Sequence, residues 1–150
     1  MRLAEALQER AGLDRRIQKL RERLQCNAVV QEGERPAEDP QELLAELDGC
    51  IEELERLIAR INLTNCRTMV DGESLTVLLA RRDVWKAKLS AYRDLAYSAS
   101  RLGQRGTRSE IKLLSTVDVR ALQKQVDQMA KQLRLLDNSI QAANWATELI

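Results

Sequence analysis

Proline and glycine are scarce in this sequence of 150 residues, and their positions divide it into four long segments. The only two prolines, Pro36 and Pro40, lie in one short stretch. Of the six glycines, all but Gly12 and Gly49 fall in breaks between long periodic runs. Because proline and glycine disfavour helix interiors, each of the four segments has room for an uninterrupted helix.

Histidine is absent, and aromatic residues make up only 3% of the chain. Without histidine, the chain lacks the commonest general base and metal ligand, and also the Glu-x-x-His motifs of metal sites in helical bundles. Cys26, Cys50 and Cys66 have no zinc-site spacing and are typical of reduced thiols. We therefore expect no catalytic residue, no metal and no cofactor, and the role of the three cysteines stays open.

Long apolar runs are also missing. The longest, near Leu75 to Ala80, is far shorter than the roughly 20 residues that a membrane span requires. The charges at Arg2, Glu5, Glu9 and Arg10 leave no apolar core for a signal peptide. We expect a cytoplasmic protein with no membrane span.

Charge is balanced over the chain, with a net value of +1, but it is unevenly distributed. Residues 31–60 contain ten acidic and three basic residues (−7), whereas residues 80–112 contain nine basic and three acidic ones (+6). This split predicts that the acidic second segment pairs with the basic third one, within one subunit or between subunits. Nucleic-acid binding is not expected, because the basic stretch carries no recognition motif. Whether the basic residues 101–112 bind another partner is left open.

Apolar residues recur with helical periodicity in all four segments. The pattern predicts a single all-α domain over residues 1–150. We expect either an elongated antiparallel four-helix bundle or two helical hairpins completed by another subunit, with coiled-coil-like contacts. Residues 110–114 predict one short extended segment. The helices are expected at about 3–31, 40–65, 74–101 and 117–147.

The second segment has the widest apolar face. Asp39 and Pro40 are a typical helix start, as N-cap and first helical residue. One stripe comprises Leu43, Leu47, Cys50, Leu54, Leu57 and Ile61, and a second, flanking stripe comprises Leu44, Ile51 and Ile58. A face this wide contacts more than one partner helix, so we expect a homo-oligomer.

Polar residues are expected to gather at one end of the antiparallel arrangement, and two of them occupy positions in the apolar stripes. Such residues can fix the register of the helices or form a pocket for a small anionic ligand, with arginines that bind the anion and a tryptophan wall. A third possibility is that they are solvated. The candidate ligand-binding residues are Arg10, Asn62, Asn65, Arg82, Asn144 and Trp145.

Several stretches resemble one family over nearly the whole chain. They are residues 35–40 (RPAEDP), 60–65 (RINLTN), 71–76 (DGESLT), 80–83 (ARRD), 108–111 (RSEI), 116–119 (TVDV) and 140–149 (IQAANWATEL). The chain resembles small bacterial proteins labelled septicolysin, otherwise treated as a domain of unknown function. The label implies a thiol-activated cytolysin. The residues do not support that activity, because the chain has no Trp- and Cys-containing undecapeptide and no strand-rich inserting region.

Three functions follow from these observations. We expect a non-enzymatic, self-assembling helical protein with a structural or interaction role. The alternative is a binder of a small anionic ligand, or an enzyme, that uses the Arg/Asn/Trp end. A membrane-active cytolysin rests on the family label alone and is disfavoured.

Overall fold

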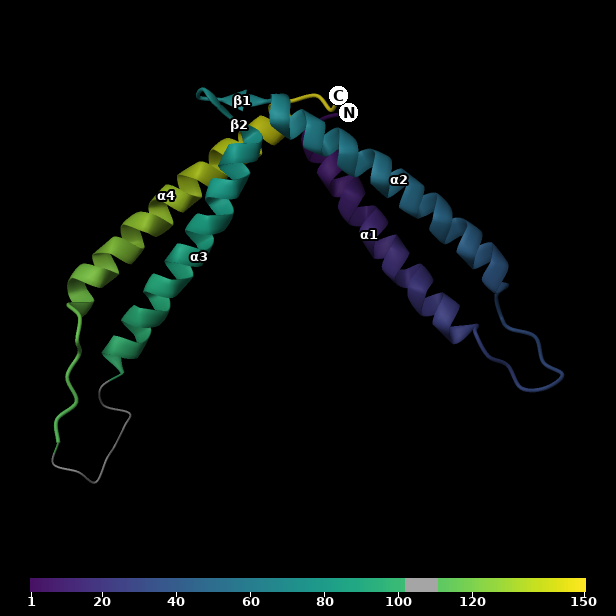
Figure 1. Cartoon of the computed structure of the whole chain (residues 1–150), viewed down its shortest axis with the longest axis horizontal. Helices are drawn as coiled ribbons and strands as arrows, with labels where there is room; N and C mark the ends of the chain where they lie inside the picture. The colour runs from purple at the N-terminus through teal and green to yellow at the C-terminus, as the bar shows by residue number, and fades with distance from the viewer. Residues whose placement is uncertain (102–110) are drawn as a thin grey trace. The chain divides into compact units, whose positions relative to one another are not determined.

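The computed structural model describes residues 1–101 and 111–150, and it is 75% helical. Its elements are α1 (Leu3–Cys26), α2 (Pro40–Arg67), β1 (Met69–Val70), β2 (Glu73–Ser74), α3 (Leu75–Ser100) and α4 (Val119–Ala146) (Figure 1). The predicted all-α class is confirmed. None of the described helices combines the length and the apolar character that crossing a membrane would require.

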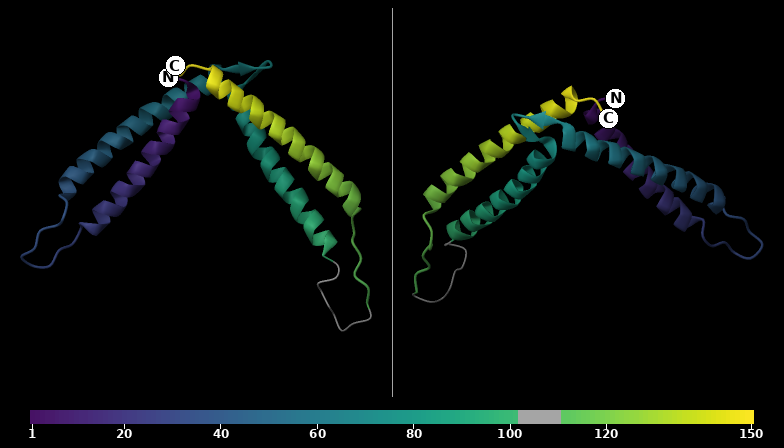
Figure 2. Two further views of the ribbon diagram at one scale, coloured as in Figure 1. Left: turned by 180° about the vertical axis from the view of Figure 1, so that it is seen from behind. Right: turned by 45° about the horizontal axis from the view of Figure 1, so that its top comes forward.

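The chain divides into two compact units. Unit 1 comprises Met1–Met69 and Ala142–Ile150, and unit 2 comprises Val70–Gln141. Within them α1 lies beside α2, and α3 lies beside α4, so each unit is built on a helical hairpin (Figure 2). The single-domain assignment stays a prediction, since two compact units can still unfold as one.

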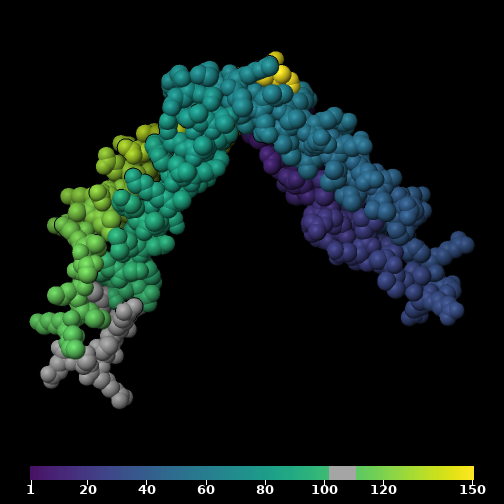
Figure 3. Space-filling view, viewed as in Figure 1, coloured from purple at the N-terminus to yellow at the C-terminus, as the bar shows by residue number. Residues whose placement is uncertain are grey.

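The hairpin of unit 1 is held together by the apolar stripe predicted for α2. Leu43, Cys50, Leu57 and Ile61 are each at most 5% exposed. On α1, the buried residues include Leu3, Ala6, Leu13 and Leu20. Burying one such leucine contributes about 1.5–3 kcal/mol, and the side chains of the two helices meet along the hairpin (Figure 3).

The first helix ends at Cys26, about five residues earlier than the sequence predicted. Asn27 provides the physical reason. Its Nδ2 donates to the Arg23 carbonyl oxygen at 2.8 Å, and its Oδ1 accepts from the Glu38 backbone N–H at 2.9 Å. The side chain thus closes α1 and fastens the connection that leads to α2. That connection also contains Gly33 with φ of 88°, a conformation that glycine adopts without strain.

The start of α2 follows the prediction. Asp39 Oδ1 accepts from the Gln41 N–H at 2.9 Å, and Pro40 is the first helical residue. The cap satisfies one of the N–H groups that a helix leaves unpaired at its start. Local sequence signals therefore suffice to place this boundary.

A small β-hairpin lies between α2 and α3. The sequence had instead predicted an extended segment near residues 110–114. Strands β1 and β2 pair across Asp71 and Gly72, whose φ angles are 50° and 86°. Two consecutive positive φ values are those of a tight two-residue turn. The prediction of a strand at Ile111–Leu114 is wrong, because these residues are in neither helix nor strand. They have no strand partner in the described parts of the chain, and residue 110 lies outside those parts.

The long hairpin of unit 2 follows, and its two helices contribute separate buried positions. Leu78, Leu89 and Ala96 of α3 are buried, as are Leu122 and Val126 of α4. Ser74 Oγ caps α3 by accepting from the Val77 N–H at 3.4 Å. Glu73 lies just before that cap and binds Arg81 of α3, so β2 is tied to the first turns of the helix.

Candidate functional site

One end of unit 1 brings together the start of α1, the end of α2 and the residues that follow α4. The Leu3 N–H donates to the Thr147 carbonyl oxygen and the Leu149 N–H to the Met1 carbonyl oxygen, both at 2.9 Å. These bonds form an antiparallel bridge between Arg2 and Glu148. Segments far apart in the sequence therefore close the unit at this end.

Side chains reinforce the same end. Thr64, only 1% exposed, accepts from the Ile150 N–H at 3.1 Å and donates to the Arg60 carbonyl oxygen at 2.8 Å. Arg60 Nε donates to the Ile150 carbonyl oxygen at 2.7 Å. Arg2 Nη1 donates to the Ala146 carbonyl oxygen at 3.1 Å. Sequence reasoning missed these residues, because their partners lie 86 to 144 positions away.

Five of the six predicted ligand-binding residues belong to unit 1. Arg10 is half-buried on α1, while Asn62 is exposed and Asn65 half-buried on α2. Asn144 is 6% exposed, whereas the neighbouring Trp145 is 54% exposed. In the described parts of the chain, none of the five makes a side-chain hydrogen bond or ion pair.

The sixth residue, Arg82, belongs to unit 2 and is paired there. Its guanidinium lies 3.3 Å from Asp83 Oδ1 and 3.7 Å from Asp137 Oδ1. The second contact joins α3 to α4 and balances the charge of this half-buried arginine. Ligand binding by the six residues stays a prediction.

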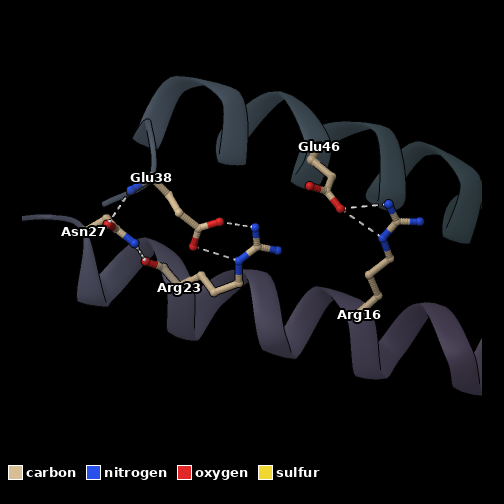
Figure 4. A network of polar contacts seen from close by, with 5 residues as sticks. All are labelled: Arg16, Arg23, Asn27, Glu38 and Glu46. Atoms are coloured by element: carbon tan, nitrogen blue, oxygen red, sulfur yellow. Dashed lines mark hydrogen bonds and ion pairs between the residues drawn. The ribbon is translucent and has the colours of Figure 1, made fainter. Parts of the chain in front are cut away.

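Two ion pairs hold α1, one to α2 and one to the connection that precedes α2 (Figure 4). Arg16 donates to Glu46 Oε1 from Nε at 3.1 Å and from Nη2 at 2.7 Å. Arg23 binds both carboxylate oxygens of Glu38. The hydrogen bonds from Arg23 lower the pKa of Glu38, and those to Glu46 raise the pKa of Arg16. All four side chains are more than a third exposed. The pairs therefore orient α1 in the hairpin more than they add stability.

An open hollow of about 680 Å³ lies between α3 and α4 of unit 2. It contains three cationic side chains and one carboxylate. Asp127 accepts from Gln123 Nε2 at 3.0 Å, but the three cations have no ion-pair partner among the described residues. The polar and aromatic lining consists of Arg93, Tyr97, Ser100, Arg120, Gln123, Lys124 and Asp127.

Sequence reasoning did not find this hollow, although the basic charge of residues 80–112 was a signal for it. The basic segment 101–112 that was left open as a partner site falls mostly outside the described residues. Two smaller hollows, of about 130 and 230 Å³, share Lys88, Met129 and Gln132. Trp85 lines one of them and Tyr92 the other.

The outer stripe of α2 is an apolar feature that α1 leaves partly uncovered in unit 1. Leu44 is 41% and Ile51 is 45% exposed. Ile58, which lies two turns after Ile51, is half-buried. In the inner stripe of the same helix, four of the six residues are buried, and Leu47 and Leu54 are half-buried. The wide apolar face predicted from the sequence is therefore present, with only one of its two stripes covered.

The possible metal ligands of residues 1–101 and 111–150 are cysteine, aspartate and glutamate, since the chain has no histidine. These two ranges contain no cluster of three cysteine, aspartate or glutamate side chains that could hold a metal ion. All three cysteines are free thiols, with Cys50 buried and Cys26 and Cys66 exposed.

These features define an all-α protein of two helical hairpins whose notable surfaces are an apolar stripe and a basic hollow. Residues 10–149 match the model of a family of unknown function, DUF6847, and the chain belongs to that family. A crystal structure of a functionally unknown conserved protein from Corynebacterium diphtheriae is 42% identical, with a TM-score of 0.95. The match covers 100% of this chain and 99% of that one. No curated protein matches the chain.

The resemblance to septicolysin-labelled proteins is wrong. The matching family has no assigned function, and the similar crystal structure is described only as functionally unknown. Neither finding points to a septicolysin family, so the cytolysin function that this label implied loses its sole support.

Proposed function

We propose that this protein is a non-enzymatic, self-assembling helical protein, and that a second copy covers the outer stripe of α2. The observation that carries the proposal is the exposure of Leu44 and Ile51, at 41% and 45%, beside an inner stripe whose residues are all buried or half-buried. Covering apolar surface contributes about 25 cal/mol per Å². A helix face of this kind is therefore stabilised when another helical surface packs on it.

The charge distribution favours a second copy as the occupant. The outer stripe belongs to the acidic stretch of the chain (−7), and the same chain carries a basic stretch of nearly equal size (+6). Each copy therefore supplies both the surface that needs a partner and a surface of opposite charge. Complementary charges of this kind steer association and set its orientation.

The mass of the protein in solution tests the proposal. At micromolar concentration and physiological salt, light scattering should give at least twice the chain mass of 17.1 kDa. The double variant Leu44→Glu/Ile51→Glu should fall to the monomer mass, because two charges would have to be buried in the contact.

A matched control is Ala45→Glu/Leu63→Glu, which adds the same two charges to exposed positions of α2. These positions lie about 100° further around the helix, so the control should keep the wild-type mass. Circular dichroism would verify that both variants are folded. A wild-type mass of 17.1 kDa would overturn the proposal.

Binding of a small anionic ligand is the alternative function. One observation favours it: Arg10 is half-buried, and its guanidinium has no ion-pair partner in the described parts of the chain. Such a guanidinium can donate charge-assisted hydrogen bonds to an anion.

A further inference from the structure

We propose that the 680 Å³ hollow between α3 and α4 receives the Leu44–Ile51 stripe of α2 from a second copy. This inference rests on the proposed self-association and names the surface that covers the stripe. It joins unit 1 of one molecule to unit 2 of another.

Each of the two surfaces carries charges that have no partner among the described residues, and the charges of the two surfaces are opposite in sign. Arg93, Arg120 and Lys124 line the hollow, and none of them is paired within the described residues. On α2, Asp48 and Glu55 flank the stripe, are exposed and are likewise unpaired there. Docking would give both sets counter-charges in a contact from which water is partly excluded, where such pairs are stronger than in open solvent.

The apolar part of the lining is chemically similar to the stripe. Ala96, which is 6% exposed, and Val119 lie in the lining, and the Tyr97 ring is 61% exposed. Leucine and isoleucine side chains would cover this apolar lining and be covered by it. The cations of the lining would then meet the acidic flank, so that apolar and charged contacts occur together, as is typical of protein interfaces.

The hollow and the stripe also have similar lengths. The lining of the hollow runs along α3 from Arg93 to Ser100, which is about 10 Å at 1.5 Å per residue. The distance from Leu44 to Ile51 along α2 is also about 10 Å by the same rise. Two turns of α2 therefore match the length of the hollow. Recognition of an amphipathic helix by a groove follows this pattern of side-chain insertion.

Two charge-reversal variants test the proposal. The first is Asp48→Lys/Glu55→Lys on α2, and the second is Arg120→Glu/Lys124→Glu in the hollow. Each variant alone should dissociate at least tenfold more readily than the wild type, measured by analytical ultracentrifugation, because like charges then face each other. The control Lys131→Glu/Arg134→Glu reverses two exposed charges of α4 outside the lining and should behave as the wild type does.

Mixing the two variants is the decisive step. In the mixture, the lysines of the first variant face the glutamates of the second, and the native acidic stripe of the second faces the native basic hollow of the first. Every contact between unlike molecules is attractive, so equimolar mixing should restore assembly to within a few-fold of the wild type. Mass spectrometry under native conditions should show both variants in each assembly.

Two outcomes separate this proposal from the more general one. If Leu44→Glu/Ile51→Glu abolishes assembly but the hollow variant assembles normally and mixing restores nothing, self-association stands and the hollow is not its partner surface. If the wild type is monomeric, both proposals are overturned.

Discussion

Asn27 is expected to be the most important single side chain in the connection between α1 and α2. It is 9% exposed, and it bonds Arg23 behind it and Glu38 ahead of it. Replacing Asn27 with alanine removes a hydrogen bond from each of two backbone groups, the Arg23 carbonyl oxygen and the Glu38 N–H, but only one of them keeps another partner. The Arg23 carbonyl oxygen still accepts from the Asn27 backbone N–H at 3.1 Å, whereas the Glu38 N–H loses its partner.

The size of the effect follows from this difference. Losing a bond whose acceptor keeps another partner costs about 0.5–1 kcal/mol, and leaving a part-buried N–H unpaired costs about 1–3 kcal/mol. We therefore expect Asn27→Ala to lower the free energy of unfolding by about 2–3 kcal/mol. Asn27→Asp keeps the acceptor for the Glu38 N–H and loses only the donor, so it should cost about 1 kcal/mol.

Urea unfolding followed by circular dichroism, at one fixed protein concentration, would measure both variants. Asn138→Ala is a suitable control, because Asn138 is exposed on α4 and has no side-chain hydrogen bond to the described residues. A loss below about 0.5 kcal/mol for Asn27→Ala, the range of ordinary surface substitutions, would refute the assignment of Asn27 as the closing residue. Equal losses for Asn27→Ala and Asn27→Asp would refute the role given to the Glu38 N–H.

Two further predictions concern arginines. The hydrogen bonds from Arg81 lower the pKa of Glu73 in the folded protein. The stability that this pair contributes is therefore fully present above the unfolded pKa of about 4.3. It is lost as the pH falls through the lower pKa of the folded protein. Thermal melts from pH 7 to pH 3 should therefore show the gap between wild type and Glu73→Gln closing on acidification, and a constant gap would contradict this. Arg10→Met should leave stability unchanged or raise it by up to about 1 kcal/mol, because the half-buried guanidinium has no partner among the described residues. The same variant tests the alternative function: loss of a thermal shift that a small anion produces in the wild type would support ligand binding, and no anion-induced shift in either protein would count against it.

The sequence predicted those parts of the fold that depend on neighbours along the chain. Asp39 and Pro40 mark the start of α2 because capping is local, and Asp71 with Gly72 marks a turn because few residues accept positive φ. The stripes of α2 followed from helical periodicity. The end of α1 was misplaced, because Asn27 was assigned only to a position in the helical repeat and its bond to Glu38 could not be inferred from spacing.

The candidate site was harder to predict for the same reason. Thr64 has no signal in its own neighbourhood, and its role depends on Ile150, which lies 86 residues away. The hollow of unit 2 depends on how α3 and α4 are spaced, and side-chain periodicity does not encode that spacing. Arg82 was singled out as a charged residue in an apolar stripe, but its partner Asp137 could not be chosen from among the many acidic residues.

The bridge between Arg2 and Glu148 has a consequence for the order in which the protein folds. Unit 2 is continuous in sequence, whereas unit 1 is built from residues 1–69 together with residues 142–150. The ribosome releases a chain from its N-terminus at roughly 5–20 residues per second, so α1 and α2 emerge well before the segment that completes their unit. Unit 1, most of which is synthesised before unit 2, is thus completed only after unit 2 has been synthesised, when the Ile150 N–H reaches the Thr64 hydroxyl.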